Sequence, residues 1–230
     1  MTITVQLPTL VSIFLVTTIL IIVLIVFNRA LVNFNAEDEP RGVVLLALMA
    51  VETVDNIVGA DVYDEIKENL GPYVGMLWGY ILTSCLFGLT GFEAPTGNFS
   101  VTLVLALITV FLVEFCAIKY NGIKNYAHGL VEPIFLFLPM NIFGKIAPII
   151  SLSLRLFANI LSGTIIMTLF YTFTGYLSSF IPVIGSFNIF GVFLGPFLHL
   201  YFDLVSSLLQ TFIFTSLTII FIGKELPQEE

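Results

Sequence analysis

Long apolar runs separated by short polar segments dominate the sequence. Runs of about 20 apolar residues are typical of membrane-spanning helices, whereas membrane β-strands would alternate over segments of about ten residues, a pattern this chain lacks. The sequence therefore predicts an all-α integral membrane protein, organised as a single membrane domain over residues 1–230. Its five transmembrane spans are expected at about residues 10–32, 73–89, 101–118, 146–176 and 187–222.

Two further segments, residues 42–68 and 122–145, mix apolar and polar positions. In the first, one helical face carries only apolar side chains, which is typical of an amphipathic helix at the membrane surface; a further span is the alternative. That face is formed by Val44, Ala47, Leu48 and Val51. The second segment is predicted to be a surface-lying or re-entrant connection.

The last apolar run is longer than a single crossing requires. A continuous helix over residues 187–222 would measure about 54 Å, against about 30 Å of hydrocarbon core. We therefore expect the last two helices to be long and tilted, with Pro196 as a candidate kink.

Composition supports a membrane protein and argues against several function classes. Hydrophobic residues make up 58% of the chain and charged residues only 10%, well below the roughly 25% of soluble domains. The net charge of -8 does not suggest a nucleic-acid partner. No glycine-rich phosphate loop is present, so no ATP site is expected, and neither a cofactor nor a metal is predicted. Cys85 and Cys116 lie in apolar runs and are interpreted as packing residues.

The basic residues predict an orientation. Of the eight Lys and Arg residues, seven lie in or beside segments that five spans would put on one side of the membrane. They are Arg29, Arg41, Lys67, Lys119, Lys124, Lys145 and Lys224. The positive-inside rule then predicts an outer N-terminus and a cytoplasmic C-terminus, with a bacterial plasma membrane as the expected location. The first run is too long for a signal h-region and lacks a basic n-region, so it is expected to be a retained span.

The eighth basic residue, Arg155, lies inside an apolar run. A charge at that depth costs about 2.5–3.5 kcal/mol on insertion scales, so it usually marks a transport pathway or a counter-ion. Polar residues at helical spacing form one stripe on the fourth span and another on the fifth, and both stripes open toward the predicted outer side. The first stripe consists of Ser151, Arg155, Asn159 and Ser162, and the second of His199, Asp203, Ser206 or Ser207, and Gln210. Facing each other, they would line a hydrated path down to Arg155 and Gln210.

This region resembles subunit a of the F-type ATP synthases. The resemblance is carried by I-S-L-S-L-R-L-F-A-N-I-L-S-G around Arg155 and by L-L-Q-T-F-I-F-T-S-L-T from Leu208 to Thr218. Weaker matches are A-P-T-G-N-F-S-V-T at 94–102, L-F-G-L-T-G at 86–91 and E-P-I-F-L-F-L-P-M-N-I-F at 132–143. Together they cover most of the chain from about Gly71 onward.

The resemblance implies an ion-translocating stator subunit of a rotary motor. Its expected partners are the c-ring, the peripheral stalk subunit b, the other ATP synthase subunits, the transported H⁺ or Na⁺, and the lipid bilayer. Two half-channels would end at mid-membrane, with Arg155 between them as barrier and as partner of the c-ring carboxylate. A guanidinium suits this role because it stays charged when a lysine could lose its proton. Asn159 matches the family's channel asparagine, and Gln210 matches the glutamine that faces the arginine.

The sequence departs from the family at several polar positions. Thr164 stands nine residues after the arginine, where the family often has Glu or His, and Asp203 stands seven before the glutamine, where His or Glu is common. Asp203 is therefore expected to be the outer relay, with His199 one turn outward. Asn98 and Ser100 replace an Asp and an Asn of the loop motif, which argues against a role for that loop in ion uptake. Further candidates are Ser162, Ser206 and Thr164 for the outer path, and Glu114 and Ser151 for the inner one.

Structural roles are the alternatives for several of these residues. Arg155 could simply pair with Asp203, and Gln210 could be an interhelical hydrogen-bonding residue. Glu114 could be an interfacial acid whose carboxylate reaches water, and His199 could lie at the outer mouth without transferring protons. For the whole protein, the alternative is a self-contained secondary transporter or channel with a buried Arg–Asp gate, although no internal repeat is visible. The two polar stripes argue against a scaffold without transport.

Overall fold

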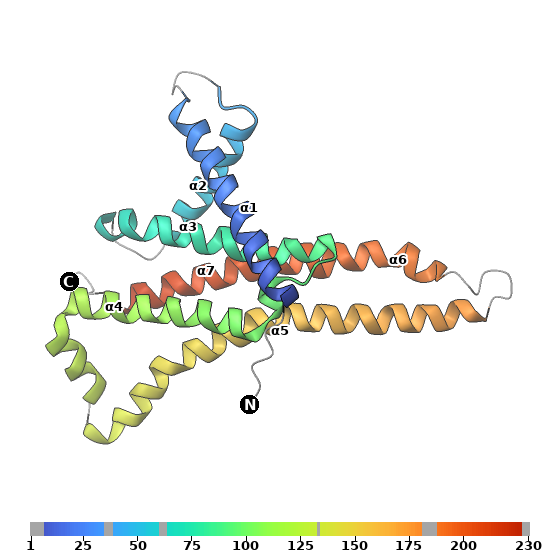
Figure 1. The fold of residues 1–230 in the computed structure, drawn as a ribbon. Coiled ribbons are helices and arrows are strands. Elements are labelled where there is room, and N and C mark those ends of the chain that lie inside the picture. Colours follow the sequence, from blue (N-terminus) through green and yellow to red (C-terminus); the bar gives the residue numbers. More distant parts are fainter. Residues whose placement is uncertain (1–6, 35–38, 60–63, 133, 181–187, 227–230) are drawn as a thin grey trace.

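A computed structural model describes residues 7–34, 39–59, 64–132, 134–180 and 188–226 (Figure 1). Every regular element in these ranges is helical. The α-helices are α1 (Leu7–Val32), α2 (Val43–Val58), α3 (Asp64–Phe87), α4 (Phe99–Val131), α5 (Leu138–Ser179), α6 (Ile189–His199) and α7 (Ser206–Glu225). Short 3-10 turns are η1 (Gly88–Thr90), η2 (Pro95–Gly97) and η3 (Phe135–Phe137), and η4 (Leu200–Val205) is a π-helix between α6 and α7.

Five helical segments are long and apolar enough to cross a membrane, which confirms the predicted all-α membrane fold. They are Leu7–Val32, Leu70–Thr90, Phe99–Val131, Phe135–Ser179 and Ile189–Glu225. The division into a single membrane domain stays a prediction.

The C-terminal half forms an antiparallel pair, in which α5 runs beside α6, η4 and α7 (Figure 1). Helix α4 packs on α5 and α7, and α3 packs on α7. Helix α1 crosses this group at a steep angle (Figure 1). Helices that cross steeply cannot all stand along one membrane normal, which supports the expected tilt of the last two helices.

The main core lies where α3, α4, α5 and α7 meet. It consists of Leu77, Ile81, Cys85, Ala106, Leu152, Leu156 and Phe214, each at most 5% exposed. In a bilayer such contacts stabilise the fold through close packing, because lipid tails are as apolar as the side chains. Leu152 and Leu156 bracket Arg155 on α5, so their burial fixes the rotation of α5 about its axis and leaves Arg155 on an exposed flank.

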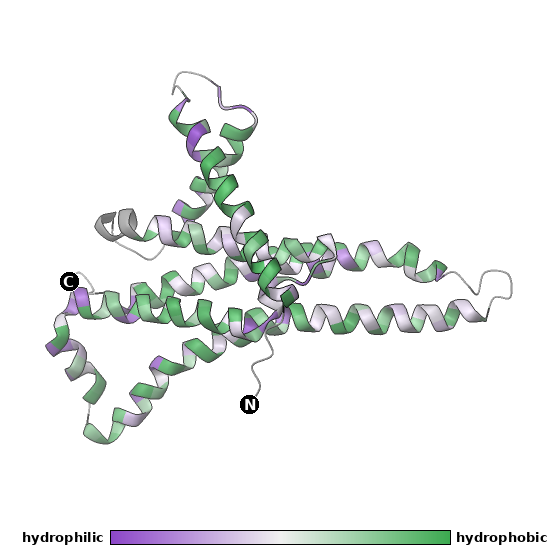
Figure 2. Ribbon diagram, viewed as in Figure 1, coloured by the Kyte–Doolittle hydropathy of each residue, from purple (hydrophilic) through white to green (hydrophobic). Residues whose placement is uncertain are grey.

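The long helices are rich in apolar residues (Figure 2), and many of these side chains are exposed. Phe111 on α4 and Val192 on α6, for example, are each 74% exposed. Exposed apolar area on this scale is unfavourable in water and is expected on a protein solvated by lipid.

The connecting segments are largely helical. Over residues 122–145, α4 continues to Val131 and α5 begins at Leu138. Helix α4 is kinked at Gly122, whose φ of 77° is favourable for glycine. The role of residues 122–145 as a surface-lying or re-entrant connection stays a prediction. In α2, Ala47 is buried and Val51 is 48% exposed. The buried face continues through Val54, Ile57 and Val58, which pack toward α3 and α7. The position of α2 at a membrane surface stays a prediction.

The last helix is not one continuous α-helix. Its π-turn lies at Leu200–Val205, four residues beyond Pro196, the candidate kink. Because a π-turn holds more residues than an α-turn, the spacing used to place His199, Asp203 and Gln210 on one α-helical face does not hold across it.

Candidate functional site

Arg155 lies on the exposed flank of α5, one residue from the buried Leu156. Within the described part of the chain it forms no ion pair or hydrogen bond. The Arg155–Asp203 pair considered from the sequence is not formed, because Asp203 is paired with His199. Arg155 is thus a charge held in place by the packing of its helix and left without a partner among the described side chains.

The polar stripe of the last span contains a hydrogen-bonded acid–base pair. Nδ1 of His199, the last residue of α6, lies 2.6 Å from Oδ2 of Asp203 in η4. Their side chains are 43% and 28% exposed, so both remain accessible to water or ions. An imidazole and a carboxylate in contact can pass a proton between them, which fits the predicted role of Asp203 and His199 in an outer relay.

Tyr171 is a neighbour of this pair that the sequence analysis did not identify. Its ring centroid lies 6.0 Å from that of His199. The close packing of Tyr171 depends on Gly195, since a Cβ there would lie 2.5 Å from the Tyr171 hydroxyl oxygen. The local sequence gives no sign of this role for Tyr171, because Gly195 and His199 lie on a different helix and come close to it only in the folded chain.

One direct hydrogen bond joins the two polar stripes. The hydroxyl of Ser206 donates to Oδ1 of Asn159, so α5 and the start of α7 are linked one turn beyond Arg155 along α5. Ser162 and Thr164 instead donate to backbone carbonyls of α5 itself, at 3.0 Å each. Thr164 also lies about 180° around the helix from Arg155, on the other side of α5. The structure therefore brings together Asn159 and Ser206 but not Ser162 or Thr164.

Gln210 is buried, with only 6% of its surface exposed. Its Nε2 has no hydrogen-bond partner among the described residues, including Arg155. An unpartnered buried donor costs about 1–3 kcal/mol, so this amide is suited to take a partner that the isolated chain lacks. Ser151, one turn inward of Arg155, is exposed on α5.

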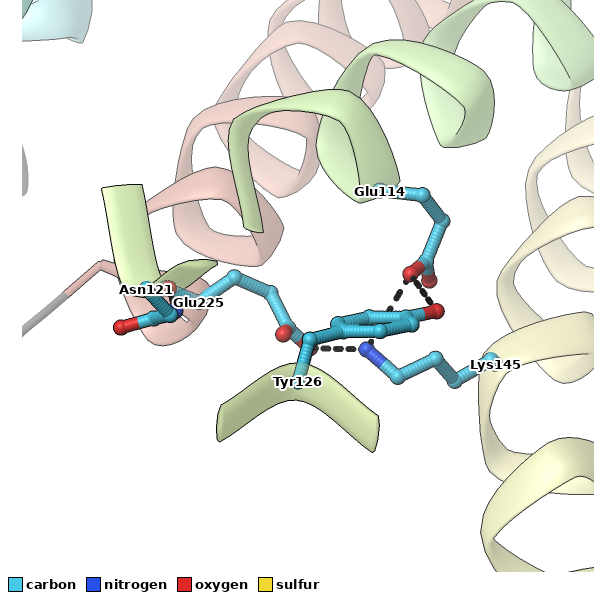
Figure 3. Close-up of polar contacts among 5 residues, drawn as sticks. All are labelled: Glu114, Asn121, Tyr126, Lys145 and Glu225. Atoms are coloured by element: carbon cyan, nitrogen blue, oxygen red, sulfur yellow. Dashed lines mark hydrogen bonds and ion pairs between the residues drawn. The ribbon is translucent and has the colours of Figure 1, made fainter. Parts of the chain in front are cut away.

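A second polar cluster lies near the other ends of the helices, around Lys145 (Figure 3). Lys145 Nζ lies 3.3 Å from Oε2 of Glu114 and 2.8 Å from Oε1 of Glu225. The hydroxyl of Tyr126 donates to the same Glu114 oxygen at 2.6 Å, and Lys145 Nζ lies 4.9 Å from the centroid of the Tyr126 ring. Asn121 donates to the backbone oxygen of Glu225 at the end of α7. We call Glu114, Asn121, Tyr126, Lys145 and Glu225 the inner cluster.

Of the inner cluster, sequence reasoning identified only Glu114. Lys145 and Glu225 are 80 positions apart, and Lys145 was assigned to the peripheral basic residues. Tyr126 reaches Glu114 because the Gly122 kink folds the end of α4 back; along a straight helix, 12 residues would separate the two by about 18 Å. Within the described ranges, no group of three or more His, Cys, Asp or Glu side chains is suited to hold a metal ion.

These features define a class of protein: a helical membrane protein with an unpaired arginine and polar groups on its last two long helices. Comparison with known proteins assigns the chain to a family of this class. The sequence profile of the family described as "ATP synthase A chain" matches residues 10–223. The chain belongs to this family, and it is a multi-pass membrane protein.

Individual relatives carry the same description. The chain is 36% identical to "ATP synthase subunit a" of Mycoplasma genitalium, over 69% of this chain and 59% of that protein. It is 29% identical to "ATP synthase subunit a" of Mycoplasmoides gallisepticum, over 95% of this chain and 78% of that protein. A third relative, "ATP synthase subunit a" of Mycoplasma pneumoniae, is 34% identical over 76% of this chain and 64% of that protein. The match thus spans about three fifths of the first and third relatives and about three quarters of the second.

Proposed function

We propose that this chain is the ion-translocating stator subunit of a rotary ATP synthase, working beside a c-ring and held by a peripheral stalk that includes subunit b. The transported ion is most simply a proton. The observation that carries the proposal is Arg155: a charge on a membrane helix, locked in orientation by Leu152 and Leu156, exposed on its flank and without a partner among the described residues. Such a cation suits an anionic partner supplied by another subunit.

In the proposed mechanism, an ion from the outer side passes His199 and Asp203 and then the Asn159–Ser206 contact. It reaches the level of Arg155, where it loads a c-ring carboxylate. The loaded, neutral carboxylate turns away with the ring, and an ionised carboxylate arriving from the other half-channel is attracted to the permanent charge of Arg155. The same charge repels a cation that would cross directly from one half-channel to the other.

Gln210 and the inner residues have supporting roles in this scheme. The unpartnered Gln210 amide is available to a water molecule or to the ring carboxylate at the level of Arg155. Glu114 and Ser151 are the candidates for the inner half-channel, on the inward side of Arg155 along α4 and α5. No catalytic site for ATP is proposed in this chain; the chemistry of ATP belongs to other subunits.

The test is ATP-driven ion pumping by the whole complex in vesicles, comparing wild type with Arg155→Ala. Pumping is expected to fall to background while assembly and ATP hydrolysis by the complex persist. The matched control is Leu154→Ala, which shortens an exposed side chain next to Arg155 without removing charge. Wild-type pumping by the Arg155→Ala complex would mean that Arg155 is structural. A self-contained transporter would instead move ions when this chain is reconstituted alone, a result that the proposed function excludes.

A further inference from the structure

The first part of α5 lacks the apolar packing that holds the rest of the helix. No side chain from Leu138 to Pro148, which we call the inner segment of α5, is buried. The first buried residue of the helix is Leu152. The main core and the second apolar cluster, which joins α4 to α7 around Cys116 and Ile222, contain no residue of the inner segment. Fully buried apolar side chains therefore do not fix the position of this segment.

A proline separates the inner segment from the part of α5 that carries Arg155. Pro148 lies inside the helix, where it removes the hydrogen bond to the carbonyl four residues earlier and favours a bend. The first part of α5 runs at an angle to the rest of the helix and away from α4 and α7 (Figure 1). The backbone hydrogen bonds of α5 alone therefore do not fix the direction of the inner segment relative to the rest of the helix.

Polar contacts of two side chains tie the inner segment to the rest of the protein. Asn141 donates to the backbone oxygens of Leu130 and Glu132, which belong to the folded-back end of α4. Lys145 reaches farther, to Glu114 in the straight part of α4 and to Glu225 at the end of α7 (Figure 3). Lys145 thus joins this segment to both α4 and α7.

The Lys145 contacts differ from ordinary surface ion pairs. The side chains of Lys145, Glu114 and Glu225 are only 24%, 24% and 31% exposed. Partly buried pairs are screened less by salt than exposed ones. Further contacts support this site: the Tyr126 hydroxyl orients the Glu114 carboxylate, and Asn121 holds the backbone of Glu225 in place.

We propose that Lys145 is a positioning residue for ion translocation: by bridging Glu114 and Glu225 it holds the inner segment of α5 against α4 and α7. Arg155 lies ten residues farther along the same helix, about 15 Å at 1.5 Å per residue. The bridge thereby fixes the direction from which α5 approaches the level of Arg155 and the spacing of the helices on its inward side. This inference rests on the proposed function for its effect on transport, but not for its effect on structure.

The experiment measures the distance between α4 and α5 and the rate of ATP-driven pumping, both in the assembled complex. Spin labels at Phe143→Cys on α5 and Phe115→Cys on α4, two exposed positions outside the inner cluster, report the distance between these helices once Cys85 and Cys116 are replaced by Ala. In Lys145→Met, the distance distribution should broaden and shift to longer values. ATP-driven pumping should fall about tenfold, because small misplacements of reacting groups have large effects on rate. Lys145→Arg, which can still reach both carboxylates, should restore both readouts.

The matched control is Lys224→Met, which removes the same charge one residue from Glu225 but breaks no ion pair within the described residues. It should leave the distance and the pumping rate at wild-type values. If Lys145→Met does not assemble, Glu225→Gln tests the same bridge more mildly, since it leaves the contact with Glu114; it should give a smaller change of the same kind. An unchanged distance distribution in the variant that assembles would overturn the proposal, as would failure of Lys145→Arg to restore it.

A changed distance with pumping equal to that of Lys224→Met would also overturn it, since the segment would then move without effect on transport. Failure of the proposed function is a separate result, seen as wild-type pumping by Arg155→Ala in the same preparation.

Discussion

The outer and inner polar regions of this chain are built in opposite ways. In the outer region, His199 and Asp203 are neighbours one turn apart, and the last span is joined to α5 by hydrogen bonds between uncharged groups, such as that from Ser206 to Asn159. In the inner cluster, Lys145 joins carboxylates from two other helices, and residues far apart in sequence meet through ion pairs. We propose that the outer groups exchange protons, whereas the inner groups hold helices together.

This difference suggests how each region tolerates change. An outer relay depends on the ability of one carboxyl group to gain and lose a proton, so an isosteric but non-titrating amide should remove its function. The inner cluster depends on attraction between fixed charges, so it should respond to the loss of any partner and recover when charge is restored.

The largest effect should come from neutralising matching carboxylates in the two regions. Asp203→Asn keeps the size of the side chain but cannot relay a proton, so pumping should fall by about a hundredfold, in the range of general acid–base contributions. Glu114→Gln, its inner counterpart, should have a clearly smaller effect because Lys145 keeps its contact with Glu225. Thr164→Glu should not compensate for Asp203→Asn, because Thr164 lies on the side of α5 opposite Arg155. The measurement is ATP-driven pumping in vesicles, and equal rates for Asp203→Asn and wild type would remove Asp203 from the path.

A smaller effect, on stability rather than rate, is expected at the kink that shapes the inner cluster. Gly122→Ala places a Cβ at a φ of 77° and should destabilise the folded chain by about 1–2 kcal/mol. Gly129→Ala is the control: that glycine lies in the same helix, has an ordinary φ and has open space where a Cβ would lie. Unfolding in detergent, followed by circular dichroism, should separate the two variants. Equal stabilities would show that alanine adopts the positive φ at Gly122 without strain.

The smallest effect should come from the single bond between the outer stripes. Ser206→Ala removes the donor to Asn159, and interhelical hydrogen bonds in membranes average about 0.6 kcal/mol, so pumping should change by about threefold. Ser162→Ala, which removes a hydroxyl bonded only within its own helix, should change it less. A larger effect at Ser162 than at Ser206 would reverse the assignment of which hydroxyl matters.

Much of the fold followed from the sequence because membrane helices are encoded by the length of their apolar runs. The five expected spans have counterparts among the long helices, although α4 and α5 extend well beyond the predicted limits. They extend because helices continue through interfacial polar residues until a backbone break such as Gly122 intervenes. Arg155 stood out for the same reason, as the basic residue inside an apolar run.

What the sequence did not reveal depends on contacts between distant segments and on backbone irregularity. Lys145 was grouped with the peripheral basic residues because its partners lie 31 and 80 positions away. Tyr171 was missed because its neighbour His199 lies on another helix. The α-helical spacing that aligned His199 with Gln210 failed at Leu200–Val205, since no residue pattern announced a π-turn there.

That π-turn has a consequence for how the last helix can change in evolution. A π-turn is equivalent to one residue inserted into an α-helix, which shifts the phase of everything that follows by about 100°. Deleting one residue between Leu200 and Val205 would let the helix close into regular α-turns, and Gln210 and the fully buried Phe214 would rotate away from their present neighbours. Substituting one of these residues would change only its immediate surroundings, whereas deleting one residue would rotate the whole of α7 about its axis. The length of this stretch is therefore under stronger constraint than the identity of its apolar residues.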